Sequence, residues 1–104
     1  MPVTTIGVTA VHVDAEGFLT DYDEWDETLS VQLAAQIGIE LTDTHWTAIR
    51  FLREDFREEG ETATLRRVST LAGIPVKELF ALFPGKPAKK MAYVAGLPKP
   101  HGCV

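Results

Sequence analysis

The chemistry that this sequence can offer centres on a single cysteine, Cys103, which stands next to the last residue. A free cysteine is most often a small buried hydrophobe, but a position so near a chain end can seldom be enclosed by the fold. An exposed thiol invites oxidation, which a purely structural sequence has little reason to keep. We therefore expect Cys103 to act as a sulfur-carrying or redox nucleophile in its thiolate form.

Lys99 and His101 are the side chains nearest in sequence that could assist this thiol. Both can supply positive charge, which favours a thiolate, and an imidazole can also shuttle the proton. The terminal carboxylate of Val104 acts in the opposite direction, so the sequence leaves the balance open. His101 can equally be a solvated tail residue. His45, beside Trp46 near the start of an expected helix, is expected to pack or to cap rather than to catalyse.

Other residue patterns that would support catalysis are missing from the sequence. The one cysteine and the three histidines, at positions 12, 45 and 101, lack the spacing of metal ligands. No phosphate-binding glycine loop, catalytic triad or pair of acid and base carboxylates stands at motif spacing. We therefore expect no metal and no cofactor. Whether the chain is an enzyme in its own right stays open, because it offers a nucleophile but no independent active site.

Charge is unevenly divided along the chain. Residues 1–48 hold nine of the fifteen acidic residues and none of the ten basic ones. Beyond Glu78 the charged side chains are all lysines, namely Lys86, Lys89, Lys90 and Lys99. This asymmetry favours an acidic partner, protein or RNA, for the C-terminal part of the chain. A solvated surface without a partner is the alternative, and the pattern alone does not separate the two.

Residues 65–83 have the layout of a helix-turn-helix, with two short helices joined by a tight turn at Gly73. In DNA-binding examples the second helix reads the major groove. The second helix here offers only Lys77 outward, against Glu78, and has few donors for base edges. We therefore expect two packed helices, and we disfavour direct binding of nucleic acid.

The composition is that of an ordinary globular protein of one domain. The chain has 104 residues, of which 45% are apolar and 24% are charged. No apolar run approaches the length of about 20 residues that spans a membrane, and the first residues show no signal-peptide pattern. A lone cysteine cannot form an internal disulfide, which fits a reducing compartment. We expect a cytoplasmic protein without membrane contact.

We expect an α+β fold, mainly helical, in which an N-terminal β-hairpin packs on a bundle of about five helices. The strands are predicted at 3–6 and 8–13. The helices are predicted to begin at Asp21 or Asp23, at Thr42, at Thr62 or Thr64, at Pro75 and near residue 87. The prolines that follow bias the chain end to an extended course. We therefore expect one domain, 1–96, followed by a mobile arm, 97–104, that carries Cys103.

The helix expected after Thr42 has the clearest pattern in the chain. Its buried stripe is predicted from residues at helical spacing: Trp46, Ile49, Leu52 and Phe56. Its exposed face is predicted to hold most of the charged residues: Arg50, Arg53, Glu54 and Arg57. This helix should therefore contribute a large part of the core.

Several segments of the chain resemble the DsrC/TusE family of sulfur-relay proteins. They are EGFLTDYDEW (16–25), ELTDTHWTAIRFLRE (40–54), LFPGKPAKKMAYVAGLPKPHGCV (82–104) and, more weakly, TLRR (64–67). The ending AGLPKPHGCV is the most specific part, and the resemblance covers nearly the whole chain. It implies a helical domain with an N-terminal β-hairpin and a flexible C-terminal arm. It also implies that the penultimate cysteine, Cys103, carries the function.

The number of arm cysteines separates branches of this family. Members that serve dissimilatory sulfite reductase have a second cysteine on the arm, and the position aligned with it is Ala92 here. Without a second thiol, the arm cannot close an internal disulfide or trisulfide. The resemblance therefore favours single-cysteine, TusE-like members. These accept a persulfide from a TusBCD/DsrEFH-type donor and pass it towards a tRNA thiouridylase for 2-thiouridine synthesis; sulfur oxidation is a further possible role.

The sequence also departs from the family where partners could dock. The stretch between the third and fourth helices is shortened to 69–78, and Ala63 replaces a common proline, although Arg66 matches the family's arginine. Our leading expectation is a sulfur carrier that uses Cys103 and works with partner proteins. The residues expected to dock or steer the partner are Arg66, Lys86, Lys89, Lys90, Lys99 and His101. The alternatives are a regulatory module that contacts DNA or a sulfur enzyme, and a sulfite-reductase-associated subunit, which Ala92 disfavours.

Overall fold

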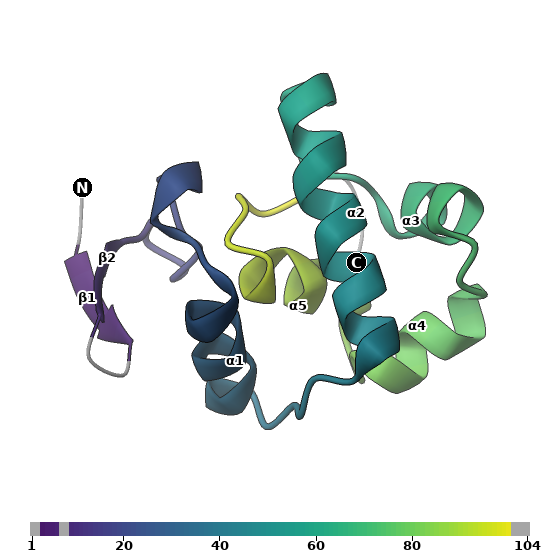
Figure 1. Ribbon diagram of the computed structural model, residues 1–104, viewed down its shortest axis with the longest axis horizontal. Helices are drawn as coiled ribbons and strands as arrows, with labels where there is room; N and C mark the ends of the chain where they lie inside the picture. The colour runs from purple at the N-terminus through teal and green to yellow at the C-terminus, as the bar shows by residue number, and fades with distance from the viewer. Residues whose placement is uncertain (1–2, 7–8, 101–104) are drawn as a thin grey trace.

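The computed structural model describes residues 3–6 and 9–100, in which a two-stranded hairpin precedes five α-helices (Figure 1). The elements are β1 (Val3–Ile6), β2 (Thr9–His12), a 3₁₀ helix η1 (Tyr22–Glu24), α1 (Glu27–Gln36), α2 (Asp43–Glu59), α3 (Leu65–Ala72), α4 (Val76–Leu82) and α5 (Pro87–Val94). The helix α5 contacts α1, α2 and α4, and it lies in the middle of the molecule in Figure 1. The predicted α+β class, mainly helical, is confirmed.

The hairpin is an antiparallel pair in which Val3 lies opposite His12. It packs against α1, where Val11 joins a small core cluster with Leu29 and Leu33. The second strand ends earlier than the predicted Val13. That residue instead forms an isolated bridge to Leu19, because the chain turns back on itself between them.

The start of α1 differs from the prediction. We expected Asp21 or Asp23 to cap this helix, but Asp26 is the N-cap, and its carboxylate accepts the Leu29 N–H at 2.7 Å. Asp21 caps η1 instead. Trp25, at helical spacing from Leu29, has an extended backbone and lies between the two helices. Several acidic residues in a row can each cap a helix locally, and tertiary contacts of Trp25 decide which one does.

The start of α2 is built around His45, which is only 5% exposed. Its Nε2 donates to the Leu82 carbonyl at 2.8 Å, since a carbonyl oxygen can only accept. Its Nδ1 is then the acceptor for the Thr42 N–H at 3.0 Å, which completes half of a capping box. The ring also packs edge-on against Phe83 at 5.0 Å. The predicted packing and capping role of His45 is therefore confirmed.

The later helix boundaries follow local signals. Thr64 caps α3 as one of the two predicted residues, with its Oγ1 accepting from the Arg67 N–H. Pro75 precedes α4 instead of opening it, because its ψ of 143° is extended. Pro87 is the first residue of α5, where a missing N–H has no consequence. Among the described residues, no helix is long and apolar enough to cross a membrane.

Candidate functional site

Cys103 and His101, which we expect to carry the chemistry, lie outside the described residues. The structure does describe residues 94–100, the segment that leads to them, which we call the arm root. Leu97 is fully buried and belongs to the main core, and Pro100 is also buried. The start of the expected arm is therefore packed on the domain. The boundary at residue 97 and the mobility of the arm stay predictions.

A sharp turn ends α5 and begins the arm root. The Leu97 N–H donates to the Ala92 carbonyl at 3.0 Å and the Gly96 N–H to the Tyr93 carbonyl at 3.2 Å, which together form a Schellman motif. Gly96 has φ of 69°, a left-handed conformation. A Cβ on it would lie 2.5 Å from Trp25 Cδ1. Backbone conformation and space both require glycine at position 96.

The last carbonyl groups of α5 receive side-chain donors from elsewhere in the fold. The Val94 carbonyl accepts from Trp25 Nε1 at 2.9 Å and from Ser30 Oγ at 2.8 Å. The Ala95 carbonyl accepts from Arg53 Nη1 at 2.8 Å. These carbonyls are orphans of a helix end, and water would otherwise have to satisfy them. The end of α5 is thus attached to α1, to α2 and to the segment between η1 and α1.

Arg53 is the main correction to the predicted exposed face of α2. Its side chain is half-buried, with the guanidinium Cζ 3.8 Å from the Tyr22 ring centroid and 4.2 Å from that of Trp25. Besides the Ala95 carbonyl, it donates to the Tyr22 carbonyl at 2.8 Å. Burial lowers the pKa of Arg53 from its ordinary value, although an arginine stays ionised. A signal was present in the sequence, since positions 49, 53 and 56 share one helix face.

Two contacts hold the arm root beyond Gly96. Thr62 Oγ1 donates to the Pro98 carbonyl at 2.7 Å. Lys99 Nζ lies 3.3 Å from Glu16 Oε1, with the two side chains 40% and 55% exposed. Such a surface ion pair contributes little stability. It does compensate part of the charge that we expected Lys99 to supply to the thiol.

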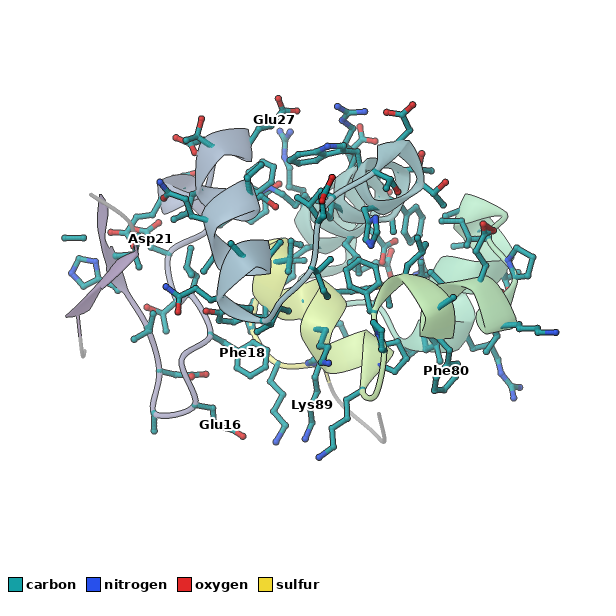
Figure 2. The ribbon with its side chains drawn as sticks, turned by 90° about the horizontal axis from the view of Figure 1, so that it is seen from below. Glu16, Phe18, Asp21, Glu27, Phe80 and Lys89 are labelled. Carbon is teal, nitrogen blue, oxygen red and sulfur yellow. The ribbon has the colours of Figure 1, made fainter. Side chains whose placement is uncertain are left out.

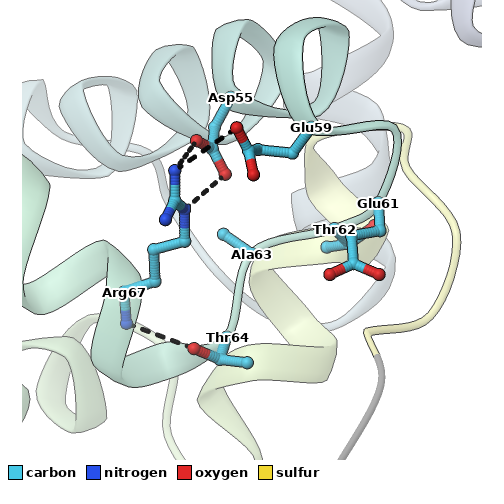
Figure 3. A pocket seen from close by; sticks show the side chains of 7 residues that line it. All are labelled: Asp55, Glu59, Glu61, Thr62, Ala63, Thr64 and Arg67. Atoms are coloured by element: carbon cyan, nitrogen blue, oxygen red, sulfur yellow. Dashed lines mark hydrogen bonds and ion pairs between the residues drawn. The ribbon is translucent and has the colours of Figure 1, made fainter.

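A pocket of about 80 Å³ lies beside the arm root (Figure 3). Its lining residues are Asp55, Glu59, Glu61, Thr62, Ala63, Thr64 and Arg67. Asp55, whose side chain is 5% exposed, accepts from Arg67 Nε at 2.9 Å and from Arg67 Nη2 at 2.7 Å. The hydrogen bond to Asp55 raises the pKa of Arg67. The two parallel hydrogen bonds hold α3 against α2. Because the guanidinium of Arg67 is already paired with Asp55, we interpret this pocket as structural and not as an anion-binding site.

The predicted docking residues fall in two places. Lys86, Lys89 and Lys90 share one face at the start of α5, and Lys90 Nζ donates to the Pro84 carbonyl. Figure 2 shows Lys89 on the same side of the molecule as Glu16, the partner of Lys99. Arg66 is exposed on α3 instead. It lines a second, open pocket of about 430 Å³ together with Arg67, Thr64, Thr70 and Leu71, and this pocket shares Thr64 and Arg67 with the first one.

The helix-turn-helix segment is a pair of packed helices, as predicted. Val68 of α3 and Leu79 of α4 are fully buried in the main core. The outer face of α4 shows large apolar side chains, since Val76 is 41% and Phe80 42% exposed (Figure 2). Apolar side chains of this kind do not hydrogen-bond to base edges, so this geometry gives no support to a DNA-reading role.

Comparisons with known proteins agree with this geometry. A family model described as DsrC like protein matches residues 5–104. Sulfurtransferase TusE of Salmonella typhimurium is 39% identical over 101 residues, which cover 90% of this chain and 93% of that protein. Sulfurtransferase TusE of Pectobacterium atrosepticum is also 39% identical, with the same shares covered.

Solved structures show the same fold. DsrC of Allochromatium vinosum has a TM-score of 0.82 at 35% identity, with 98% of this chain and 97% of that chain covered. The oxidized gamma-subunit of the dissimilatory sulfite reductase (DsrC) of Archaeoglobus fulgidus has a TM-score of 0.78 at 36% identity, with 99% and 100% covered. The match of the family model and the identity to TusE extend over nearly the whole chain. This chain therefore belongs to the DsrC-like family.

Proposed function

We propose that this protein is a sulfur carrier that takes up sulfane sulfur on Cys103 and passes it to an acceptor. The relationship to sulfurtransferase TusE over 90% of the chain supports the sulfur-carrier role. The observation that carries the choice of residue is that the DsrC-like family match runs to residue 104 and so includes the only cysteine of the chain. A thiolate is the nucleophile that such a transfer needs.

The uptake step requires no redox partner. The Cys103 thiolate attacks the outer sulfur of a donor persulfide, a new S–S bond forms at Cys103, and the S–S bond of the donor breaks. The donor leaves as a thiolate, so atoms and electrons balance. In the discharge step, an acceptor thiolate attacks the same outer sulfur, and Cys103 leaves as a thiolate. Each step therefore needs a second protein to supply or to receive the sulfur.

A protein of this kind needs a docking surface more than it needs a pocket. We propose that Lys86, Lys89 and Lys90, on one face of α5, dock an acidic surface of the partner together with the arm residues Lys99 and His101. Lysines at the first turn of a helix are unfavourable for its dipole, and α5 has no acidic residue there to offset them. That local cost supports a binding role. Arg66, on α3, would then contact a different part of the partner.

The partners that we propose are a persulfide donor of the TusBCD/DsrEFH type and an acceptor such as a tRNA thiouridylase. The names of the TusE relatives support a relay of this kind. The lone thiol supports it as well: the position aligned with the second family cysteine is Ala92, which lies buried in α5. Cys103 is the only cysteine of the sequence, so any disulfide or persulfide bond that it makes must join another molecule. We expect the protein to work in the cytoplasm, where a reducing pool keeps one thiol free.

A relay experiment with labelled sulfur tests this function. A TusBCD-type complex loaded with ³⁵S persulfide is incubated with this protein, which is then separated and offered to an acceptor thiol protein. We expect label on the wild-type protein and then on the acceptor, and none on either with Cys103→Ser. Label that reaches the acceptor equally well through Cys103→Ser would rule the proposal out.

A further inference from the structure

We infer that Arg53 is a positioning residue for sulfur transfer: it fixes the place and direction in which the chain leaves the domain towards Cys103. This inference rests on the proposed function, because only a delivered thiol needs a fixed point of departure. Arg53 is far from Cys103 in sequence and lies on the middle helix turn of α2. Its effect on the thiol would therefore be exerted through the arm root alone.

The guanidinium of Arg53 makes contacts both at its edge and on its faces. Nη1 donates to the Ala95 carbonyl and Nη2 to the Tyr22 carbonyl, each at 2.8 Å. The planar group is in contact with the rings of Tyr22 and Trp25, at 3.8 and 4.2 Å from their centroids. Only a planar fork with several donors can stack on rings and bind two carbonyls at once. A lysine at this position would keep the charge and lose the geometry.

Three elements converge on the arm root through these contacts. Trp25, which Arg53 stacks on, donates to the Val94 carbonyl and stands against Gly96, where no Cβ would fit. Ser30 of α1 donates to the same carbonyl. Figure 1 shows the chain leaving the end of α5 and crossing towards α2. The arm root is thus oriented by side chains from α1, from α2 and from the segment before α1.

Stability alone gives a weak account of Arg53. Burial of an ionised group carries a desolvation cost, and apolar residues of similar volume often stabilise a fold as well or better. The site does favour a cation, because the C-terminal end of α5 carries the negative end of the helix dipole. The guanidinium of Arg53 has donors in a fixed geometry and lies where the chain leaves the end of α5, so it determines the direction that the chain takes there. That is the property on which delivery of a thiol depends.

The reach of the arm makes this direction important. Cys103 stands five residues beyond Pro98 in the sequence, so at about 3.5 Å per residue its Cα stays within ~18 Å of that point. Pro98 is itself held by Thr62. If the arm root is displaced, the region that Cys103 can reach is displaced with it relative to a docked partner. The effective concentration of the thiol at the partner's sulfur then falls. Displacements of about 1 Å can cost up to ~100-fold in rate.

The test compares Arg53→Lys with Arg50→Lys, a matched change on the same helix. Arg50 is exposed and pairs with Glu27 at 3.3 Å, both side chains being 64% exposed. Two rates are measured: sulfur transfer from a persulfide-loaded TusBCD-type complex, and alkylation of Cys103 by iodoacetamide. For Arg53→Lys we expect transfer to fall about tenfold or more while alkylation stays within about twofold of wild type. For Arg50→Lys we expect both rates unchanged.

A measurement that needs no sulfur donor separates this inference from the proposed function. In a Trp46→Phe background Trp25 is the only tryptophan, and energy transfer to a dansyl group on Cys103 gives the spread of the distance between them. Arg53→Lys should broaden that spread. Trp25→Tyr in the Trp46-containing chain, which removes the indole N–H, serves for the rate measurements if Arg53→Lys does not fold. The inference would be overturned if Arg53→Lys lowered the transfer rate and the alkylation rate by the same factor. It would also be overturned if both the transfer rate and the distance spread of this variant equalled those of wild type. If the wild-type protein took up no sulfur at all, the proposed function would be contradicted instead.

Discussion

Several side chains in this protein form hydrogen bonds with backbone groups that have no partner within a helix or strand. Glu24 is one example: its Oε1 accepts the His12 N–H at 2.8 Å, and its Oε2 lies 2.7 Å from His12 Nδ1. Thr62 does the same for the Pro98 carbonyl, and Arg53 for that of Ala95. Each such bond joins segments that are distant in sequence, so each one fixes the position of an element.

The Glu24 contact predicts a pH dependence of stability. The backbone N–H of His12 lowers the pKa of Glu24, and the hydrogen bond to the His12 ring adds to the effect. Because the folded-state pKa lies below the unfolded value of about 4.3, the carboxylate stabilises the fold above that value. This stabilisation is lost as the pH falls through the lower, folded-state pKa. Glu24→Gln should therefore melt below wild type at neutral pH, and the two should converge in acid.

Thermal unfolding between pH 7 and pH 3 checks this expectation, with Glu27→Gln as the control. Glu27 pairs with Arg50 on the surface, where both side chains are 64% exposed. A pair of that kind contributes little, and a carboxylate in the first turn of α1 adds about 0.3–1 kcal/mol through the helix dipole, so the difference between this variant and wild type should be smaller than that of Glu24→Gln. Melting curves of Glu24→Gln that run parallel to wild type across the whole range would contradict the assigned role.

At the scale of elements, short polar caps decide where the helices begin. The α3 helix has only eight residues and begins after Thr64, whose Oγ1 accepts the Arg67 N–H at 3.2 Å. Arg67 in turn binds Asp55 on α2. The cap therefore sets the first turn of α3 in the position where its arginine can reach α2.

Removal of this cap should destabilise the protein. We expect Thr64→Ala to lower the free energy of unfolding by about 1 kcal/mol, which lowers the Tm by roughly 4 °C or more for a domain of this size. Thr70→Ala on the same helix is the matched control, since Thr70 is exposed and away from the cap. It should leave the Tm unchanged or raise it slightly, because alanine is the better helix former. Equal losses in both variants would show that the cap is not the cause.

Elements with local start and stop signals could be predicted from the sequence. Thr42, Thr64 and the turn at Gly73 after α3 act through neighbours in the chain, and the structure has them where we predicted. Asp26 could not be singled out among several acids in a row. The tertiary contact of Trp25 with Val94, 69 residues away, decides that the chain bends there. The pattern of neighbouring residues cannot predict a contact between residues so far apart in the sequence.

The candidate site divides in the same way. The chemistry of Cys103 follows from its type and position, without a fold. The contacts that orient the arm root come from Trp25, Ser30, Arg53 and Thr62. Ser30, Arg53 and Thr62 are polar or charged and, taken singly, suggest surface residues, whereas Trp25 suggests a core residue. Their shared target becomes visible only when α1, α2 and α5 are in place.

At the scale of the whole molecule, acidic and basic side chains gather in different segments of the fold. Seven acidic residues fall in residues 14–27, between the hairpin and the first turn of α1, and the hairpin and α1 lie at the opposite end from α3 and α4 in Figure 1. The helix α5 lies between them in Figure 1, and its Lys89 is on the same side of the molecule as Glu16, the partner of Lys99, in Figure 2. A molecule with this distribution can orient an acidic partner before contact is made.

Charge reversal on α5 should slow that association. We expect Lys89→Glu to lower the association rate with the persulfide donor several-fold, with a difference that shrinks as salt shortens the Debye length below about 8 Å. Lys77→Glu makes the same change in net charge on exposed α4. It should have a smaller effect, measured by stopped-flow at two salt concentrations. Equal slowing by both variants would indicate that net charge matters and that the α5 face does not.

The central claim, that Cys103 carries the sulfur, is tested most directly by intact-mass spectrometry of the protein after incubation with a loaded persulfide donor. We predict that the wild-type chain gains the mass of one sulfur atom, that fragmentation assigns this mass to Cys103, and that dithiothreitol removes it. Cys103→Ser should gain nothing. A wild-type mass that does not change, or a gain that persists in Cys103→Ser, would contradict the account.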